Sequence, residues 1–329
     1  MQNIKNISEK DRLELQKKAK KGSKWLYSAF RMVILLSIGY IIIYPLFYMI
    51  VTSLVSGDAY RNSTRVWIPT AFNVVDNYVK GAGTLNYLSS LWNTFKTEII
   101  SAVFQICSCA IAGYGFARFN FKGKKLLTAI LFLSILVPDM MVLIPRMVNF
   151  SKLDFLGILG LFEKLTGLEL RPNITNTGWT FWIPSFLGVG LRSGILIFIY
   201  IQFFKGLPRE LEEAAWVDGA GPIRTFLRIA LPSSGVVILT VSVFSLIWHW
   251  NDSLLSSMYM TKDYPLSVML SQFRVNLLQI YNIEFNSNDP QSAAIAMASC
   301  VLFVAPMLIF YMIVQHWFIE SIDRVGITG

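Results

Sequence analysis

The stretch Gly206–Pro232, GLPRELEEAAWVDGAGPIRTFLRIALP, is a polar segment between two long apolar runs. Pro208 suits the first turn of a helix, because a residue there needs no N–H for an intrahelical hydrogen bond. The residues that follow, Arg209–Val217, are mostly good helix formers. A hinge and the start of a second short helix should come next, at Gly219, Gly221 and Pro222. The sequence therefore predicts a helix, a glycine hinge and a second helix.

Each predicted helix has one small or apolar face. In the first helix, the 3.6-residue period places on one side Leu211, Ala214, Ala215 and Asp218, with Glu210, Glu212 and Glu213 beside them. In the second helix, one face holds Ile223, Phe226, Leu227 and Ala230. Two adjacent alanines leave a narrow surface on the first helix. A second protein could pack closely against it.

This stretch resembles the signature loop of the membrane subunits of binding-protein-dependent ABC importers. The similar residues are Glu213-Ala214-Ala215, then Gly219 after three residues, Ile229 after nine more, and Leu231-Pro232 after one. The flanking residues, Gln202–Glu212 and Asp218–Ala220, resemble the carbohydrate branch, the maltose-type permeases. The resemblance implies a cytoplasmic loop that sits in a cleft of an ATP-hydrolysing subunit. Its docking residues would be Glu213, Ala214, Ala215, Asp218, Gly219, Ile229, Leu231 and Pro232.

Composition indicates a polytopic membrane protein. The chain has 329 residues, of which 54% are hydrophobic and 15% charged, and this is too apolar for a soluble globule of that size. A span needs about 20 apolar residues. Six stretches meet or nearly meet this length: Met32–Leu54, Ile99–Phe116, Leu126–Pro145, Phe181–Phe204, Val236–Asn251 and Ala293–Phe318. We therefore expect an all-α integral membrane protein with six transmembrane helices, and the resemblance implies a type I importer transmembrane domain.

The distribution of Lys and Arg predicts the orientation. The first thirty residues carry eight Lys or Arg against three acids, which should keep them in the cytoplasm. The connection between the second and third spans holds four basic residues and no acid, Arg118, Lys122, Lys124 and Lys125. Counting spans from a cytoplasmic start also places Gly206–Pro232 and the C-terminus inside. The net charge of +9 is thus a topology signal and does not indicate nucleic-acid binding.

The predicted organisation has three parts. Residues 1–30 form a basic cytoplasmic tail, residues 31–55 the first span, and residues 93–320 the importer core with the docking loop 206–232. Residues 151–179 form an extracytoplasmic insertion, in which an interfacial helix is expected over 155–168. The insertion is a candidate contact for the solute-binding protein, or else a tolerated surface insertion.

Polar residues at membrane depth are the candidates for a substrate path. Asp139 either lines a polar path or caps the segment that starts after Pro138. Arg192 is either an anchor at the outer end of its span, which is favoured, or a cavity residue. The step after the fifth span adds Trp248, Trp250, Asn251 and Asp252, which could instead pack helices or form an aromatic girdle. His249 is expected to be a packing residue.

The sequence lacks the motifs of an enzyme. It contains no Gly-x-x-x-x-Gly-Lys-Ser/Thr phosphate loop, nucleophile elbow or zinc-binding helix, so no catalytic residue and no metal ligand is expected. The chain should bind no cofactor itself, and ATP and Mg²⁺ belong to a partner ATPase pair. The resemblance further implies a second homologous permease subunit in a heterodimer, an extracytoplasmic solute-binding protein, a sugar substrate, and a bacterial inner membrane location.

Two other classes of function compete with this interpretation. A secondary transporter coupled to an ion gradient would need paired intramembrane acids or an inverted repeat, whereas Asp139 is isolated. A membrane enzyme would need a polar catalytic cluster at the interface. The nearest candidate is a weak one, formed by His249, Asn251 and Asp252. An importer permease for a solute other than a sugar also remains open.

Overall fold

The computed structural model describes residues 9–56, 71–154, 157–169 and 171–326, of which 9–23 and 318–326 are described as backbone only. Helices make up these ranges, which contain no β-strand beyond a single isolated bridge between Val55 and Phe72. The predicted all-α fold is therefore confirmed.

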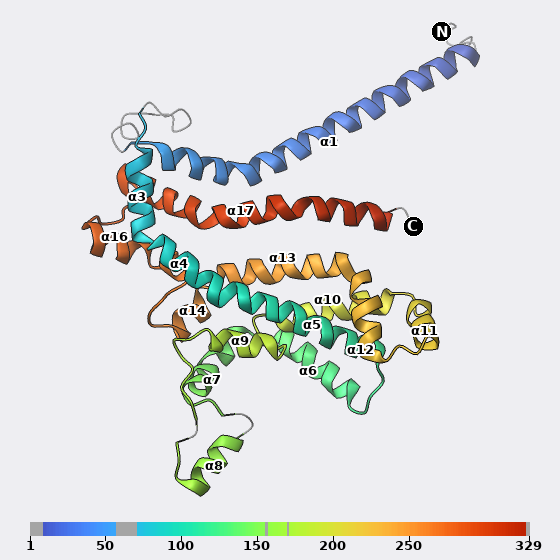
Figure 1. Ribbon diagram of the computed structural model, residues 1–329. Helices are drawn as coiled ribbons and strands as arrows, with labels where there is room; N and C mark the ends of the chain where they lie inside the picture. Colours follow the sequence, from blue (N-terminus) through green and yellow to red (C-terminus); the bar gives the residue numbers. More distant parts are fainter. Residues whose placement is uncertain (1–8, 57–70, 155–156, 170, 327–329) are drawn as a thin grey trace.

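The first and last helices are long and lie side by side (Figure 1). Helix α1 (Glu9–Leu54) is continuous, so the predicted division between a tail of 1–30 and a span of 31–55 falls inside one helix, and residues 1–8 lie outside the described part. Helix α17 (Pro290–Gly326) likewise extends beyond the predicted sixth span. Both helices continue past the apolar stretch because the flanking residues still favour helix.

The second and fifth spans are also unbroken helical runs. The second consists of α4 (Tyr87–Thr94), a π-helical turn η1 (Phe95–Ile99) and α5 (Ile100–Arg118), which form one run of 32 residues. The fifth is α13 (Gly235–Asn251), close to the predicted bounds. Among the described residues, four helices are long and apolar enough to cross a membrane.

The third and fourth predicted spans are each divided into two helices, at the places where Asp139 and Arg192 interrupt their apolar runs. Helices α6 (Lys124–Leu136) and α7 (Asp139–Ser151) meet at an angle of 103°, because Pro138 cannot continue the helical hydrogen bonds. Helices α9 (Trp179–Phe186) and α10 (Ser193–Gly206) are separated by a loop in which Gly188 and Arg192 have positive φ, 72° and 52°. The bent pair can supply a fifth span, and α10 is a shorter apolar helix.

Short helices connect the spans at the end of the bundle opposite α11. They are α3 (Val74–Thr84), α14 (Leu254–Tyr259), α15 (Leu266–Ser271) and α16 (Phe273–Tyr281). The insertion contributes α8 (Ile158–Thr166), which projects away from the bundle (Figure 1). The helix predicted over 155–168 is thus shorter, and residues 155–156 lie outside the described part. The apolar side chains of α8, such as Leu161 and Leu165, are exposed.

Helix α5 lies at the centre of the packing. It contacts α9, α10 and α13, and its residues Cys109, Ala110 and Tyr114 are buried with Leu196, Tyr200 and Phe204 of α10. The closest approach is at Gly113, where an added Cβ would lie 2.3 Å from the Cβ of Tyr200. The small residue is therefore required for α5 and α10 to touch.

Gly113→Ala is expected to destabilise the bundle, because the two helices must separate to admit the methyl group. Overpacking of this kind costs about 1–3 kcal/mol. Gly115→Ala, two residues away, meets no atom within 4 Å and serves as the matched control. Thermal unfolding in detergent should show a lower midpoint for Gly113→Ala alone. Equal midpoints for the two variants would contradict this close packing of α5 against α10.

Candidate functional site

The segment Gly206–Pro232 forms the predicted hairpin. Helix α11 (Glu210–Val217) is followed by a hinge in which Gly219 has φ 78°, and α12 (Pro222–Thr225) continues into the π-helical turn η2 (Phe226–Ala230). The hairpin lies at the same end of the bundle as both termini and the connection between α5 and α6 (Figure 1). The prediction of helix, glycine hinge and helix is confirmed.

The faces of the hairpin differ in part from those predicted. On α11, Glu212 and Ala215 are buried, while Leu211, Ala214 and Asp218 are exposed, so Ala215 does not share their surface. Glu212 turns inward because it has a buried partner, and Ala215 lies one turn beyond it. On the second helix, Ala230 is buried whereas Ile223 and Leu227 are exposed, since the π-helical turn changes the period.

The exposed part of the hairpin is both apolar and acidic. We call it the docking face and define it by the exposed residues Leu211, Glu213, Ala214, Trp216, Val217, Asp218, Ile223 and Leu227. Val217 is 88% and Ile223 76% exposed, which is unusual for large aliphatic side chains that have no partner to cover them. Of the other signature residues, Ile229 and Leu231 are half-buried and Pro232 is exposed. The docking face is suited to contact with a second protein.

A buried ion pair connects α11 to the C-terminal end of α5. Arg118 Nε donates to Glu212 Oε1 at 2.8 Å, and Arg118 Nη2 donates to the carbonyl oxygen of Leu207 at 2.7 Å. The two side chains are 5% and 2% exposed. The sequence indicated Arg118 as a topology signal in a stretch that resembles the family, and Glu212 as a flanking acid, without pairing the two.

A second polar cluster lies at the other end of α5. His249 Nδ1 is 3.0 Å from Glu98 Oε2, and Ser256 Oγ donates to Glu98 Oε1 at 2.9 Å and lies 3.1 Å from Asp252 Oδ2. Glu98 is completely buried. We call these four residues the outer cluster. Sequence reasoning missed Glu98 and Ser256, because Glu98 lies just before the predicted second span, Ile99–Phe116.

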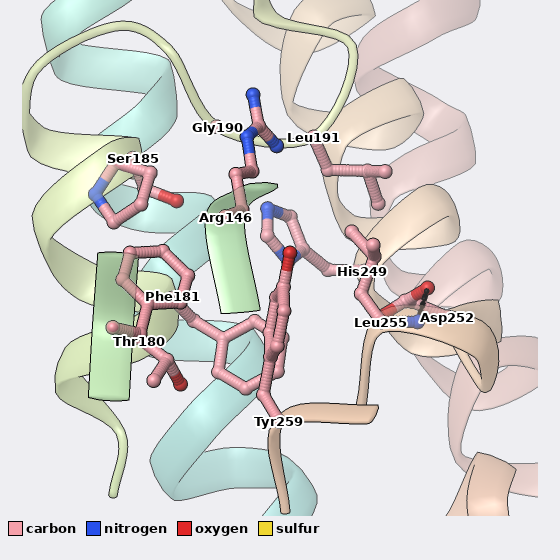
Figure 2. Close-up of a pocket in the computed structure, with 12 residues that line it drawn as sticks. Arg146, Thr180, Phe181, Ser185, Gly190, Leu191, His249, Asp252, Leu255 and Tyr259 are labelled. Atoms are coloured by element: carbon pink, nitrogen blue, oxygen red, sulfur yellow. Dashed lines mark hydrogen bonds between the residues drawn. The ribbon is translucent and has the colours of Figure 1, made fainter. Parts of the chain in front are cut away.

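A small cavity borders the outer cluster (Figure 2). Its volume of about 20 Å³ is enough for one water molecule. Three buried polar atoms around it have no hydrogen-bond partner within the described part of the chain, His249 Nε2, Ser185 Oγ and Tyr259 Oη. His249 is therefore a buried packing residue in which only one of the two ring nitrogens, Nδ1, has a hydrogen-bond partner. Figure 2 shows the guanidinium of Arg146 beside the ring of His249 in the same cavity.

A larger cavity of about 330 Å³ lies where α6, α7 and α10 meet. Asp139 and Arg192 both line it, with Ser134 and Pro138. Asp139 lies in the first turn of α7, where a carboxylate is favourable, and it also lines the cavity, so its position agrees with both of its predicted roles. The guanidinium of Arg192 lies 5.1 Å from the ring centroid of Trp248, within the range of a cation–π contact. Arg192 is thus a cavity residue, although an anchor was favoured.

The other residues of the predicted path make contacts between or within helices. Trp250 is 2% exposed and its Nε1 donates to the carbonyl of Phe303 at 3.3 Å. Asn251 is exposed and donates to Ile247 of its own helix. The carboxylate of Asp252 accepts the backbone N–H groups of Leu255 and Ser256 and so caps α14.

Comparison with known proteins identifies relatives across most of the chain. The family model "Binding-protein-dependent transport system inner membrane component" matches residues 109–324. The probable starch degradation products transport system permease protein AmyC of Thermoanaerobacterium thermosulfurigenes is 26% identical over 251 residues, 76% of this chain and 79% of the relative. The maltose/maltodextrin transport system permease protein MalG of Vibrio vulnificus is 26% identical over 246 residues, 74% and 73% of the two chains.

The fold also matches a solved structure. A chain in the crystal structure of a bacterial ABC transporter involved in the import of the acidic polysaccharide alginate aligns with a TM-score of 0.67 at 18% identity. The match covers 96% of this chain and all of the other. The arrangement of helices is therefore that of an ABC importer membrane subunit.

Proposed function

The chain belongs to the family of binding-protein-dependent transport system inner membrane components, and from this premise we propose that the solute it carries is a sugar or oligosaccharide. As a member of that family it is a transmembrane permease subunit of an ATP-driven importer in the inner membrane and not an enzyme. Its partners include an ATPase and a solute-binding protein. The carbohydrate proposal is supported by the relatives named for starch degradation products and maltodextrin.

We propose that the cavity beside α7 and α10 belongs to the solute path. Asp139 and Arg192 line the cavity and can hydrogen-bond hydroxyl groups. The ring of Trp248 supports Arg192 through the cation–π contact and so helps to hold the guanidinium at the cavity wall. A volume of about 330 Å³ is at the lower end of the range for small-molecule sites. Trp250, Asn251 and Asp252 would support the path through their helix contacts.

The docking face of the hairpin would bind the ATPase. Its apolar residues are exposed at the end of the bundle that carries both termini, as a docking surface requires. The motif residues would act there, with Gly219 setting the hinge and Ile229, Leu231 and Pro232 fixing the second helix. ATP and Mg²⁺ would be bound by the ATPase subunits and no cofactor by this chain. A second, different permease subunit would complete the pore.

The experiment that tests the proposal is co-purification followed by uptake. The chain is expressed with its partner ATPase, permease and solute-binding proteins, and purified in detergent. We expect the ATPase to be retained, and Glu213→Ala to reduce its recovery because Glu213 is exposed on the docking face. Lys122→Ala, on an exposed lysine of the neighbouring connection, is the control. Loss of the ATPase from the unsubstituted chain would refute the proposal.

Trp248→Ala is expected to lower carbohydrate uptake in proteoliposomes by about tenfold, equivalent to about 1.4 kcal/mol. The reason is that the variant removes the ring that supports Arg192, and Arg192 lines the cavity. ¹⁴C-maltotriose is the first probe. Trp92→Ala removes a tryptophan that is 67% exposed on α4 and should leave uptake unchanged. Uptake of an anionic, non-carbohydrate solute in place of sugars would assign the permease to another solute class.

A further inference from the structure

Arg118, the last residue of α5, contacts the hairpin at two separate places. Its Nε donates to the carboxylate of Glu212 on α11, and its Nη2 donates to the carbonyl of Leu207, in the turn between α10 and α11. A guanidinium presents its donors in a rigid plane, so two acceptors held by one such group cannot move independently of each other. Arg118 therefore fixes α11 to α5 in both position and orientation.

Burial makes this contact strong. The side chains of Arg118 and Glu212 are 5% and 2% exposed, so water does not compete for their hydrogen bonds. Separating the two groups would leave a buried charge without a partner, which is strongly unfavourable. By contrast, the surface pair of Lys80 and Asp76 is 23% and 38% exposed and resembles pairs that contribute little. The hairpin is thus not free to swing away from α5.

Aromatic packing adds a second attachment at the same place. The ring of Tyr114, one turn before Arg118, lies 5.3 Å from that of Phe204 at the end of α10 and 4.9 Å from that of Phe226 in η2. Phe204 precedes α11 and Phe226 follows the hinge. Both sides of the hairpin therefore pack against the last turns of α5.

Helix α5 is also fixed at its outer end and in the middle. At the outer end, Glu98 of η1 is hydrogen-bonded to His249 of α13 and to Ser256 of α14. Midway, Gln105 donates to Leu191 and Ser193 and accepts from Ser245. The helical run from Glu98 to Arg118 rises about 30 Å, the thickness of the hydrocarbon layer. A displacement at one end of α5 must therefore reach the other.

We propose that Arg118 is a positioning residue that couples the docking hairpin to α5, so that movement of the ATPases reaches the outer cluster through α5. This route would act beside α10 and α13, to which the hairpin is joined covalently. The inference rests on the proposed function, because it needs an ATPase on the docking face. Arg118 itself touches neither the ATPase-facing residues nor the solute cavity.

The direct test measures whether α11 and α5 move as one body in the complete complex. Nitroxide labels are placed at Arg209→Cys, beside α11, and Val103→Cys, on an exposed position of α5, after Cys107, Cys109 and Cys300 are replaced. With Arg118 present, addition of ATP should leave the distance distribution between the labels unchanged. With Arg118→Ala, ATP should broaden the distribution by about twofold or shift it. If ATP leaves the distance distribution of Arg118→Ala as unchanged as that of the wild type, the inference is overturned.

A transport measurement separates coupling from folding. Arg118→Ala should retain the ATPase within about twofold, because the docking face is untouched, while ¹⁴C-maltotriose uptake per ATP hydrolysed falls by about tenfold. Exchanging the charges, Arg118→Glu with Glu212→Arg, should recover part of that ratio. If the single variant loses the folded complex and the exchange restores neither complex nor uptake, Arg118 is only structural and the inference is refuted. An unsubstituted complex without ATPase would instead refute the proposed function.

Discussion

Gly219→Val is expected to abolish recovery of the ATPase with the permease. Gly219 ends α11 with φ 78°, a conformation that costs an L-residue roughly 1–2 kcal/mol and a β-branched residue more. Valine would move the residue out of the left-handed region, and α12 would leave α11 in another direction. The two halves of the docking face would then no longer match one partner surface. Because about 1.4 kcal/mol is a tenfold change in affinity, we expect a loss of tenfold or more.

Gly221→Val is the matched control for this variant. Gly221 lies two residues further along the same hinge and has φ −73°, which any L-residue adopts. An added Cβ meets no atom within 4 Å at either glycine, so backbone conformation is the difference between them. ATPase recovery measured by quantitative pull-down should fall for Gly219→Val and persist for Gly221→Val. Equal ATPase recovery for both variants would show that the hinge conformation does not determine how the two halves of the docking face are oriented.

Glu98→Ala is expected to destabilise the protein more than Gly113→Ala does. Glu98 is fully buried and accepts hydrogen bonds from His249 and Ser256, which belong to α13 and α14. Removing the carboxylate leaves both groups without this partner, and the adjacent cavity of about 20 Å³ has room for only one water molecule. Breaking a buried pair in this way costs about 3–5 kcal/mol. The folded yield and the unfolding midpoint in detergent should both fall.

Glu163→Ala is the matched control for Glu98. Glu163 also forms an ion pair, with Arg171, but the two side chains are 21% and 30% exposed and lie in the insertion. Such a pair contributes about 0–1 kcal/mol. The unfolding midpoint of Glu98→Gln, which keeps an oxygen acceptor, should lie between those of Glu98→Ala and Glu163→Ala. Unfolding midpoints that fall equally for Glu98→Ala and Glu163→Ala would contradict the role given to the outer cluster.

The local features of the fold could be predicted from the sequence. Pro208, Gly219 and Pro222 fix the start, hinge and restart of the hairpin through backbone geometry alone, and the structure has these elements in place. The breaks in the third and fourth spans fall where Asp139 and Arg192 interrupt the apolar runs. The bend itself was not predicted, because hydropathy reports how apolar a stretch is and not its direction. The 103° bend depends on Pro138, and the break before α10 depends on Arg192 with φ 52°.

The ionic contacts could not be predicted, because their partners are distant in sequence. Arg118 and Glu212 are 94 residues apart, and Glu98 and His249 are 151 apart. Arg118, Glu212 and His249 each had a simpler explanation, as a topology signal, a flanking acid and a packing residue, and Glu98 was not singled out. Residue type and local period do not encode such pairings, which arise only when α5 packs against α13 and the hairpin.

The docking face is expected to be cytosolic and covered by an ATPase, and the other proposals depend on this placement. Asp218→Cys, at an exposed position, tests it when introduced after Cys107, Cys109 and Cys300 are replaced. We expect a membrane-impermeant maleimide to label the introduced thiol in inside-out vesicles stripped of the ATPase, and bound ATPase to protect it. Labelling on intact cells, where only the extracytoplasmic side is accessible, would contradict the account.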